Sequence, residues 1–442
     1  MSFKPLTLSV LGTGYLGATH AACMAELGHT VIGYDISPEK VAILNEGKLP
    51  FHEPGLDVIV ERNVANGRLR FTSDISELTA ATVHFVCVGT PQQVNSLAAD
   101  LSQVEGAIKS LAPHLTDGSL IVGKSTVPVG TAEHLTSFLA DLTNKQVELA
   151  WNPEFLREGF AVEDTLHPDR LVYGFKDVEN ETARNILDQV YSKQLEENTP
   201  VIVTDLPTAE LVKVSANSFL ATKISFINAI AEVCEQSGAD VTKIAEAIGL
   251  DDRIGPKFLA AGLGFGGGCL GKDIRAFIAR ADELGAGEAV NFLKEVDTIN
   301  NRRREKTVDL VLEAAGDKLH NIHVTVLGGA FKPNSDDIRD SASLAVVKTL
   351  SAKGVNVTVH DPAALENINK AFPAIRTEDN LDVAIKNADI LVLATEWDNY
   401  KNFIPSNVAG KHKTVIDARN ALDPALWRAA GYEYQALGRP NA

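Results

Sequence analysis

The sequence predicts an α/β protein in which two Rossmann-like, doubly wound domains are joined by a long central helix and a helical middle domain. Short apolar runs alternate with helical patterns near both ends of the 442-residue chain, which is typical of parallel sheets covered by helices. No glycine or proline interrupts the chain between Pro207 and Gly238, which predicts a long helix between these ends. We expect domains at residues 1–204, 205–303 and 304–442.

The first domain opens with a dinucleotide-binding pattern. The apolar run Leu6 to Leu11 is followed by Gly12-Thr13-Gly14-Tyr15-Leu16-Gly17 and a helical pattern, and the next strand ends at Asp35, about 23 residues after the first glycine. Such glycines admit a pyrophosphate to a helix N-terminus, and the acid binds the adenosine ribose hydroxyls. The acid disfavours a 2′-phosphate, so NAD is favoured over NADP, although Lys40 nearby keeps that preference from being absolute.

Two later strands end in turns that carry hydroxyl groups. Val83 to Val88 leads into Thr90, and Leu120 to Gly123 leads into Lys124-Ser125-Thr126. Ligands of a doubly wound sheet bind at the carboxyl ends of its strands, so Thr90 and Thr126 are candidates for the cofactor side. The alternative is that both threonines are ordinary helix N-caps.

A further strand, Glu148 to Trp151, leads into a segment with two carboxylates. Glu154 and Glu158 lie four residues apart, so they would face the same way if the segment formed a helical turn. This favours acid/base chemistry or ligand binding. The alternative is a solvated face shared with Arg157.

The central helix is predicted to span about thirty residues, because Asp205 can cap it and Pro207 suits its first turn. A helix of this length suggests a connector between domains and a dimer contact. Lys213 and Asn217 share one face of it, among apolar neighbours. Lys213 either serves a site or extends its ammonium group along the apolar surface to water.

A glycine-rich run surrounds a cysteine in the middle domain. Residues 262–271 contain six glycines, and Cys269 is followed by Lys272 and Asp273. A nearby cation and the start of a helix at Asp273 would favour the thiolate, so we interpret Cys269 as a nucleophile. The alternative is a mobile glycine loop that holds a small buried residue. The rest of the stretch from Val241 to Ala286 has a mostly helical pattern.

The second α/β domain repeats the pattern of the first. The turn at Gly354 leads into Val355 to Val359 and ends at Asp361, much as Gly28 leads to Asp35. It has no GxGxxG pattern, so we expect no second NAD there. Cations near its turns suit a phosphorylated ligand, and these are Lys332, Arg339 and Arg419.

Composition excludes several other classes of protein. The formal charge of −17, from 41 basic and 58 acidic residues, argues against nonspecific nucleic-acid binding. The four cysteines are far apart and form no CxxC pair, which suggests neither a metal site nor a disulfide framework. We find no signal core and no apolar stretch long enough to span a bilayer, so we expect a soluble cytoplasmic protein.

Seven motifs, taken in order, resemble the UDP-glucose/GDP-mannose dehydrogenase family over nearly the whole chain. They are Gly12-x-Gly-Tyr-Leu-Gly17, Gly89-Thr-Pro91, Lys124-Ser-Thr-Val-Pro128, Asn152 to Glu158, Glu210 to Asn217, Gly264 to Asp273, and Phe331-Lys332. The resemblance implies oxidation of a sugar C6 alcohol to a carboxylate by two NAD⁺, with the aldehyde held on Cys269 as a thiohemiacetal and then a thioester. It also implies a homodimer formed through the central helical domain.

UDP-glucose is the substrate that the resemblance favours. GDP-mannose and UDP-N-acetyl sugars remain alternatives within the family. A two-electron β-hydroxyacid-type dehydrogenase, which needs no thiol, is an alternative from another mechanistic class, and an NAD-binding sensor or scaffold is one from outside catalysis.

The resemblance also implies roles for individual residues. The catalytic set is Cys269, Lys213, Asn217, Asp273, Thr126 and Glu158. The cofactor set is Gly12, Gly14, Tyr15, Leu16, Gly17, Asp35, Lys40, Thr90, Thr126, Glu158, Lys272 and Arg339. The substrate set is Glu154, Phe155, Leu156, Lys213, Asn217, Arg253, Phe265, Gly266, Phe331, Lys332 and Arg419, with Arg253 reaching across a dimer. The chain departs from the family pattern at Gly268, at Gly271 and between Gln92 and Ala99.

Overall fold

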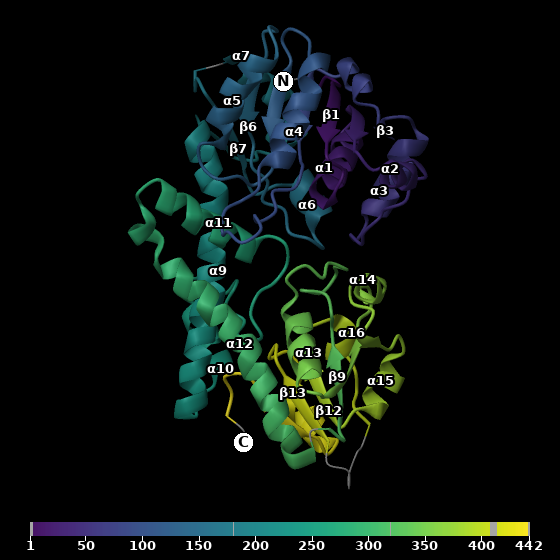
Figure 1. Ribbon diagram of the computed structural model, residues 1–442, viewed down its shortest axis with the longest axis vertical. Coiled ribbons are helices and arrows are strands. Elements are labelled where there is room, and N and C mark those ends of the chain that lie inside the picture. The colour runs from purple at the N-terminus through teal and green to yellow at the C-terminus, as the bar shows by residue number, and fades with distance from the viewer. Residues whose placement is uncertain (1–2, 180, 319, 407–412, 441–442) are drawn as a thin grey trace. The chain divides into compact units, whose positions relative to one another are not determined.

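The computed structural model describes residues 3–179, 181–318, 320–406 and 413–440, which fold into two compact units (Figure 1). Unit 1 consists of Met1–Ala216 and Arg275–Gly285, and unit 2 consists of Asn217–Ile274 and Ala286–Ala442. Helices α9 (Leu206–Ser237) and α11 (Leu270–Glu283) belong in part to each unit. The division into three domains at the boundaries given above stays a prediction.

Unit 1 is built on an eight-stranded sheet in the order β3-β2-β1-β4-β5-β6-β7-β8. Strands β1 to β6 are parallel, β7 is antiparallel to β6, and β8 is parallel to β7. The strands are β1 (Thr7–Leu11), β2 (Thr30–Tyr34), β3 (Leu69–Thr72), β4 (Val83–Val86), β5 (Leu120–Gly123), β6 (Glu148–Trp151), β7 (Leu171–Phe175) and β8 (Val201–Asp205). The helices are α1 (Tyr15–Glu26), α2 (Pro38–Asn45), α3 (Leu56–Ala65), α4 (Ser102–Leu111), α5 (Thr131–Leu142), α6 (Ala161–Leu166), α7 (Glu181–Val190) and α8 (Ser192–Glu196).

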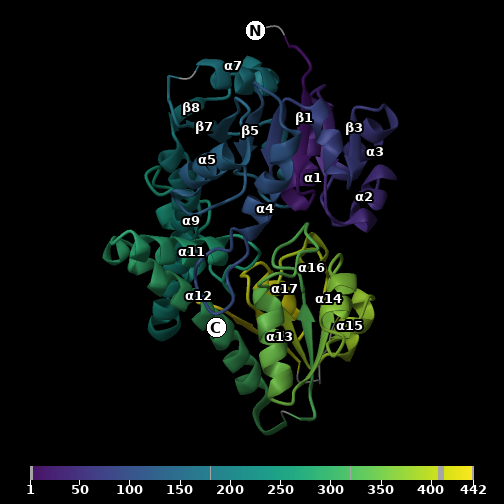
Figure 2. The same cartoon turned by 45° about the horizontal axis from the view of Figure 1, so that its top comes forward.

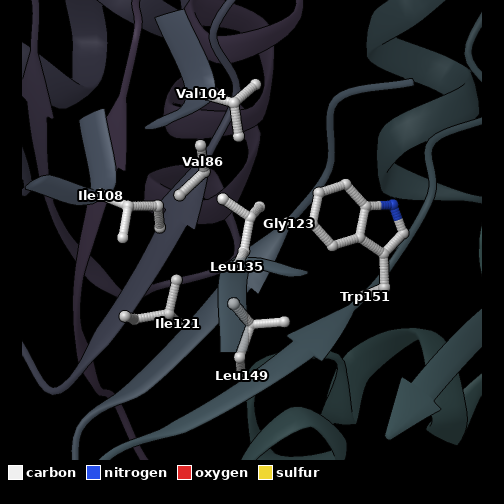
Figure 3. Close-up of a pocket in the computed structure, with 8 residues that line it drawn as sticks. All are labelled: Val86, Val104, Ile108, Ile121, Gly123, Leu135, Leu149 and Trp151. Atoms are coloured by element: carbon white, nitrogen blue, oxygen red, sulfur yellow. The ribbon is translucent and has the colours of Figure 1, made fainter. Parts of the chain in front are cut away.

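Alternate residues of each strand bury opposite faces of this sheet. Leu8 and Val10 of β1 join the apolar cluster under α1 and α3, whereas Leu11 joins the cluster under α4 and α5. The second cluster is drawn in Figure 3, where Trp151 lies beside Gly123 and a ring of aliphatic side chains fills the space between strands and helices. A Cβ at Gly123 would collide with the Trp151 indole, so a glycine is needed at this point of close packing.

Unit 2 contains a six-stranded, fully parallel sheet in the order β11-β10-β9-β12-β13-β14. In Figure 1, helices α13 and α15 lie on opposite sides of β9, and Figure 2 again shows strands between the two helices. The strands are β9 (His323–Leu327), β10 (Asn356–His360), β11 (Arg376–Thr377), β12 (Ile390–Leu393), β13 (Thr414–Asp417) and β14 (Glu433–Ala436). The helices are α10 (Val241–Gly249), α12 (Phe292–Ala315), α13 (Ala342–Ala352), α14 (Leu365–Ala371), α15 (Leu381–Asn387), α16 (Asp398–Lys401) and α17 (Pro424–Ala429).

The predicted fold class is confirmed, because both sheets contain the 3-2-1-4-5-6 order of a doubly wound dinucleotide-binding fold. The long helix is confirmed as well: α9 spans 32 residues, and the Asp205 carboxylate accepts a hydrogen bond of 2.7 Å from the Thr208 amide. Two expectations about the middle of the chain are wrong. Residues 250–269 are irregular, and α11 begins at Leu270 instead of Asp273.

The described helices also bear on membrane topology. Within the residue ranges given above, no helix combines the length and the apolar character needed to cross a bilayer.

Candidate functional site

The glycine turn between β1 and α1 has the geometry that a dinucleotide requires. Gly12 has a φ of +87°, which few other residues adopt, and a Cβ at Gly17 would overlap the carbonyl oxygen of Gly12. A Cβ at Gly14 would instead meet nothing within 4 Å. The turn is therefore closed on its protein side and open at Gly14, the residue that precedes the first helical residue, Tyr15.

Asp35 stands at the end of β2 and is 7% exposed. One carboxylate oxygen accepts hydrogen bonds from the Thr13 amide and hydroxyl, both at 3.0 Å, and from Lys40 at 2.8 Å, and the other accepts from the Ser37 amide at 3.1 Å. Burial by itself raises the pKa of Asp35, but the hydrogen bonds from Lys40, Ser37 and Thr13 outweigh it and lower the pKa overall. Asp35 is thus a carboxylate at neutral pH, as ribose binding requires. Because the Lys40 ammonium group is paired with Asp35, it does not favour binding of the 2′-phosphate of NADP.

Thr90 and Thr126 are brought together at the carboxyl ends of β4 and β5. The Thr90 hydroxyl donates a hydrogen bond of 2.7 Å to the Thr126 carbonyl oxygen. Neither is a helix N-cap, because those positions of α4 and α5 are held by Leu101 and Gly130. The alternative interpretation as N-caps is therefore wrong.

The segment after β6 holds a buried ion pair. Residues 152–157 are irregular, so the expected helical turn that would align Glu154 with Glu158 is wrong. The Glu154 carboxylate instead lies 2.9 Å from the Lys213 ammonium group, and their side chains are 12% and 7% exposed. Arg157 bonds Asp164, with distances of 2.6 and 2.9 Å, so the alternative of a solvated face that it shares with the two glutamates is wrong.

Lys213 therefore does not extend to water. Its ammonium group lies 5.6 Å from the centre of the Phe155 ring, whose environment also includes Arg170 at 3.8 Å. Removal of either Glu154 or Lys213 would leave the other charge buried without a partner, which is costly in free energy. We therefore expect the two side chains to stay paired in the folded protein. Leu156 lies beside this pair, and its amide donates to the Glu154 carboxylate at 2.7 Å.

Sequence reasoning missed a second buried lysine. Lys124 follows β5 directly, is 7% exposed, and donates to Asn152 Oδ1 at 2.9 Å and to the Tyr191 hydroxyl at 3.3 Å. Burial, with a smaller effect of the nearby Lys213, lowers the pKa of Lys124 to about 8, although Cys87 and Glu154 act in the opposite direction. The only signal in the sequence was a lysine placed directly after an apolar strand.

In unit 2, Cys269 occupies the N-terminal end of α11. Its carbonyl oxygen accepts a 2.9 Å hydrogen bond from the Asp273 amide, and its side chain is exposed. A thiol at a helix N-terminus is favoured as the thiolate by the helix dipole and the free amides of the first turn. The other three cysteines are buried, and burial raises the pKa of Cys87 to about 12.

Asp273, in the first turn of α11 after Cys269, connects this turn to α9. It is 2% exposed, its two carboxylate oxygens lie 2.7 Å from Lys272 Nζ and from Asn217 Nδ2, and Asn217 is 7% exposed. The structure thus brings Asn217, Lys272 and Asp273 together next to Cys269. Lys213 lies one turn earlier than Asn217 on the same uninterrupted helix.

The glycine run before Cys269 is packed, so the alternative of a mobile loop is wrong. A Cβ at Gly264, Gly266, Gly267 or Gly268 would in each case come closer than 3.0 Å to another part of unit 2. The atoms met are those of Asn300, the Asp340 backbone, the Phe331 ring and the Arg339 guanidinium group, respectively. Phe331 and Arg339 are thereby placed against the two residues that precede the thiol.

Two residues that sequence reasoning missed hold the backbone of this run. The Asn300 side chain bonds both the amide and the carbonyl of Phe265, at 2.7 and 3.0 Å, and Arg304 donates to the same carbonyl at 3.0 Å. Both lie on α12, 35 and 39 positions away in sequence, and no local pattern indicates the contact. Arg419, predicted to bind substrate, donates at 3.0 Å to the Gly264 carbonyl and at 2.7 Å to the Ala394 carbonyl.

The remaining candidates lie on the surface of unit 2 or close to the packed run. Arg253 pairs with Asp251 at 2.6 Å and its side chain is 88% exposed, which leaves it accessible to another molecule. Arg339 pairs with Asp337 at 2.7 Å. The Lys332 ammonium group lies 5.3 Å from the centre of the Phe331 ring. Among the residues that the structure describes, no cluster of three or more histidine, cysteine or acidic side chains could hold a metal ion.

Three profiles of one protein family match the chain in sequence. The UDP-glucose/GDP-mannose dehydrogenase family, NAD binding domain, matches residues 6–195, the central domain of that family matches residues 207–302, and its UDP binding domain matches residues 325–424. The chain is 38% identical to the UDP-glucose 6-dehydrogenase of Rhizobium meliloti (strain 1021), over 99% of this chain and 100% of that protein. It is 39% identical to UDP-glucose 6-dehydrogenase TuaD of Bacillus subtilis (strain 168), over 98% and 93%.

Solved structures give the same picture. The fold resembles that of a UDP-glucose dehydrogenase from Pyrobaculum islandicum, with a TM-score of 0.90 and 36% identity over 99% of both chains. It also resembles a UDP-D-ManNAc dehydrogenase from Pyrococcus horikoshii, with a TM-score of 0.85 and 27% identity over 99% and 100% of the two chains.

Proposed function

The chain belongs to the UDP-glucose/GDP-mannose dehydrogenase family, and from this membership we propose that it oxidises UDP-glucose at C6 to UDP-glucuronate. Each turnover consumes one water and two NAD⁺ and releases two NADH and three protons. The observation that carries the proposal is an exposed thiol at a helix N-terminus, next to Asp273 and Asn217, in a chain related over its full length to UDP-glucose 6-dehydrogenases. The enzyme is an NAD-dependent nucleotide-sugar dehydrogenase.

Unit 1 supplies the residues that would hold NAD. These are the glycine turn at Gly12, Gly14 and Gly17, the Asp35 carboxylate, and the paired threonines Thr90 and Thr126. Bound there, NAD⁺ accepts a hydride from C6 in each of the two oxidations. We assign Tyr15, Leu16, Lys40, Glu158, Lys272 and Arg339 to the same cofactor set because of the resemblance.

In the first oxidation, the C6 alcohol loses a hydride and its hydroxyl proton and becomes an aldehyde. We assign to Lys213 the stabilisation of negative charge on the C6 oxygen, with Asn217 as a second donor. Glu154 keeps the Lys213 ammonium group in place through the 2.9 Å ion pair. Asp273 and Thr126 position the water that carries the proton away.

In the second oxidation, the Cys269 thiolate adds to the aldehyde carbon. A C–S bond forms, the oxygen takes up a proton, and the product is a thiohemiacetal. Loss of that proton and of a second hydride gives a thioester. Water then attacks the thioester carbon, the C–S bond breaks, and the carboxylate leaves while the thiolate is regenerated. Glu158 is our candidate to accept the protons of these later steps.

We assign substrate binding mainly to unit 2. Phe265 and Gly266 belong to the packed run, and Phe331, Lys332 and Arg419 surround it. Cations of this kind suit a diphosphate. Glu154, Phe155 and Leu156 complete the substrate set from unit 1.

We also propose that the protein is a homodimer that associates through α9. Phe219, Phe226 and Val233 are spaced seven residues apart on this helix and are 68%, 52% and 61% exposed. A seven-residue apolar repeat is typical of a helix that packs on another helix. Arg253, 88% exposed, would then serve the partner's substrate. Light scattering tests the assignment, since Phe226→Glu is expected to yield monomers.

A cytoplasmic location completes the proposal. A catalytic thiolate has to remain reduced, and reducing compartments preserve it. Fractionation of cells that express the protein at native levels tests this assignment.

Replacement of the thiol tests the proposed chemistry. We expect wild-type protein to form two NADH per UDP-glucose, and Cys269→Ser to lose overall turnover by about 10³-fold or more while it still binds NAD. Full activity of that variant would refute the covalent mechanism. GDP-mannose and UDP-N-acetylglucosamine, assayed alongside, separate the alternatives within the family, and a yield of one NADH would favour a two-electron dehydrogenase.

A further inference from the structure

We propose that Glu53 is a positioning residue that locks the Glu158–Gly159 turn to the first turn of the dinucleotide helix α1. The inference rests on the proposed function, because it concerns how Glu158 is kept in place for the later steps of the reaction. It is carried by contacts within unit 1 that join three segments far apart in sequence. Glu53 has no place in the glycine pattern and none in the chemistry described above.

Glu53 is a charged residue with only 3% exposure, in the irregular segment between α2 and α3. Each of its carboxylate oxygens is used by the turn that carries Glu158. One accepts from the Gly159 amide at 2.6 Å and the other from the Ala161 amide at 2.7 Å. A buried carboxylate that bonds two backbone amides fixes the path of the chain at both.

Tyr15 ties this carboxylate to the glycine turn. Its hydroxyl bonds the Glu53 oxygen that the Gly159 amide also uses, and it accepts from that amide at 3.0 Å. Burial and the Glu53 carboxylate raise the pKa of Tyr15, so the phenol stays protonated and can donate. Because Tyr15 is the first residue of α1, its hydroxyl links the start of this helix to Gly159.

Glu158 directly precedes Gly159 in the chain. Its charge is one of the causes that raise the pKa of Tyr15, which places the two groups within electrostatic reach. The turn is also closed on itself, because the Arg157 side chain bonds Asp164 and the Phe160 amide donates to the Arg157 carbonyl at 2.9 Å. Glu53 therefore binds a turn, residues 157–160, whose own hydrogen bonds keep its shape. The position of Glu158 depends on where Glu53 anchors this turn.

The consequence concerns a reaction that uses two coenzyme molecules in succession. Glu158 has to occupy the same position during both oxidations. The first coenzyme dissociates between them, so it cannot keep Glu158 in place. A rigid link between the glycine turn and the Glu158 turn provides this without any contact from the coenzyme. Loss of the link should slow the chemistry more than it weakens NAD binding, because Asp35 and the glycine turn remain.

A double-mutant cycle tests whether Glu53 acts through Glu158. We expect Glu53→Gln and Glu158→Gln each to lower kcat by about 10- to 100-fold, the range expected for a misplaced catalytic group. If Glu53 acts through Glu158, the double variant is no worse than the worse single variant, within about threefold. If the two effects multiply, Glu53 has a separate role and the proposal is overturned.

Two further measurements, NAD binding and amide hydrogen exchange, test the role of Glu53 without an activity assay. The dissociation constant for NAD in Glu53→Gln should stay within about threefold of wild type, since the variant leaves the glycine turn and Asp35 unchanged. Hydrogen exchange of at least one of the Gly159 and Ala161 amides should be about tenfold faster or more in this variant, because the glutamine side chain has one acceptor oxygen where the carboxylate has two. Unchanged exchange would overturn the proposal. If wild-type protein does not oxidise UDP-glucose, the proposed function fails while this measurement still tests the link.

A matched control and a milder variant complete the design. Glu26→Gln makes the same change on α1, at a carboxylate that bonds Arg62 and Asn63, and we expect kcat within about twofold of wild type. If Glu53→Gln does not fold, Tyr15→Phe removes only the hydroxyl that links the two turns. That variant should lower kcat by about three- to tenfold, and this loss should vanish in the Glu158→Gln background. An unchanged kcat in folded Tyr15→Phe would contradict the proposal.

Discussion

The two sheets share one strand order, yet the acid at the end of the second strand does different work in each. In unit 1, Asp35 accepts hydrogen bonds from Thr13, Ser37 and Lys40 and borders a glycine turn that is open at Gly14. In unit 2, Asp361 stands at the corresponding point after β10 and is 2% exposed. The same topology therefore buries both acids, and the acid of unit 1 borders a turn that is open at Gly14.

The hydrogen bonds of Asp361 explain its burial. One oxygen accepts from the amides of Gly329 and Ala330, at 2.7 and 2.9 Å, and the other accepts from those of Ala363 and Ala364, both at 2.8 Å. Both oxygens of this carboxylate are thus engaged by backbone amides of its own unit. The comparison teaches that an acid at this position indicates a dinucleotide only when the preceding turn is open to it. We call Asp35 a ligand-facing acid and Asp361 a turn-closing acid.

The largest effect on stability is expected from Asp361→Asn. The new amide group would face two backbone N–H donors, and each buried donor left without an acceptor costs about 1–3 kcal/mol. We therefore expect a loss of roughly 3 kcal/mol in the unfolding free energy of unit 2, with an unchanged NAD dissociation constant. Calorimetry and NAD titration check the two parts, and weakened NAD binding would break the comparison.

The same substitution at Asp35 should have the opposite profile. Asp35→Asn removes a charged acceptor for the ribose hydroxyls, and hydrogen bonds to charged groups contribute about 1.5–3 kcal/mol, so NAD affinity should fall by at least tenfold. It also releases Lys40, which should narrow the preference for NAD over NADP. The kcat/KM ratio for the two coenzymes measures this change, and a variant that loses stability without losing affinity would place Asp35 among the turn-closing acids.

Unit 1 also contains a buried acid that bonds backbone amides, Glu210, and its contribution to the free energy of unfolding should depend on pH. Glu210 is 2% exposed and accepts from the Gly130 and Ala132 amides, at 2.7 and 2.6 Å, at the start of α5. Burial raises the pKa of Glu210 to about 7, although these amides act in the opposite direction. The folded protein therefore holds the proton of Glu210 more tightly than the unfolded chain between pH 4.5 and 7.

Stability contributed by Glu210 is thus present at low pH and is lost as the pH rises through about 7. Relative to Glu210→Gln, wild-type protein should lose roughly 3 kcal/mol of unfolding free energy between pH 4.5 and pH 8, at about 1.4 kcal/mol per pH unit across that window. Chemical denaturation at several pH values measures the difference. A difference that does not change with pH would show that Glu210 titrates as an ordinary surface carboxylate.

Features encoded within a few neighbouring residues could be predicted from the sequence. The glycine turn, the strand that ends at Asp35, and α9 with its cap at Asp205 follow from local composition and spacing, and the structure confirms each. The sequence predicts the start of α11 three residues too late, because cysteine is an unusual residue at the beginning of a helix and aspartate is a common one.

Features that depend on contacts between distant residues could not be predicted. Lys213 is bound by Glu154, 59 positions away, so its burial could not be distinguished from a lysine that extends to water. Phe265 is held by Asn300 and Arg304, whose helix reads as an ordinary charged helix. The sequence indicates no role for Lys124, although it begins the Lys124-Ser-Thr-Val-Pro128 motif, because its partners Asn152 and Tyr191 lie elsewhere in the chain.

The exposure of one sulfur atom among four has a practical use. Cys23, Cys87 and Cys234 are buried, and burial raises the pKa of each, whereas Cys269 is exposed at a helix N-terminus. An alkylating reagent should therefore modify native protein once per chain, at Cys269. The fraction of chains that gain the mass of one label would then measure the fraction that carries a reactive Cys269 thiol. Protection by UDP-glucose would report occupancy directly, without a coupled assay or a chromophore.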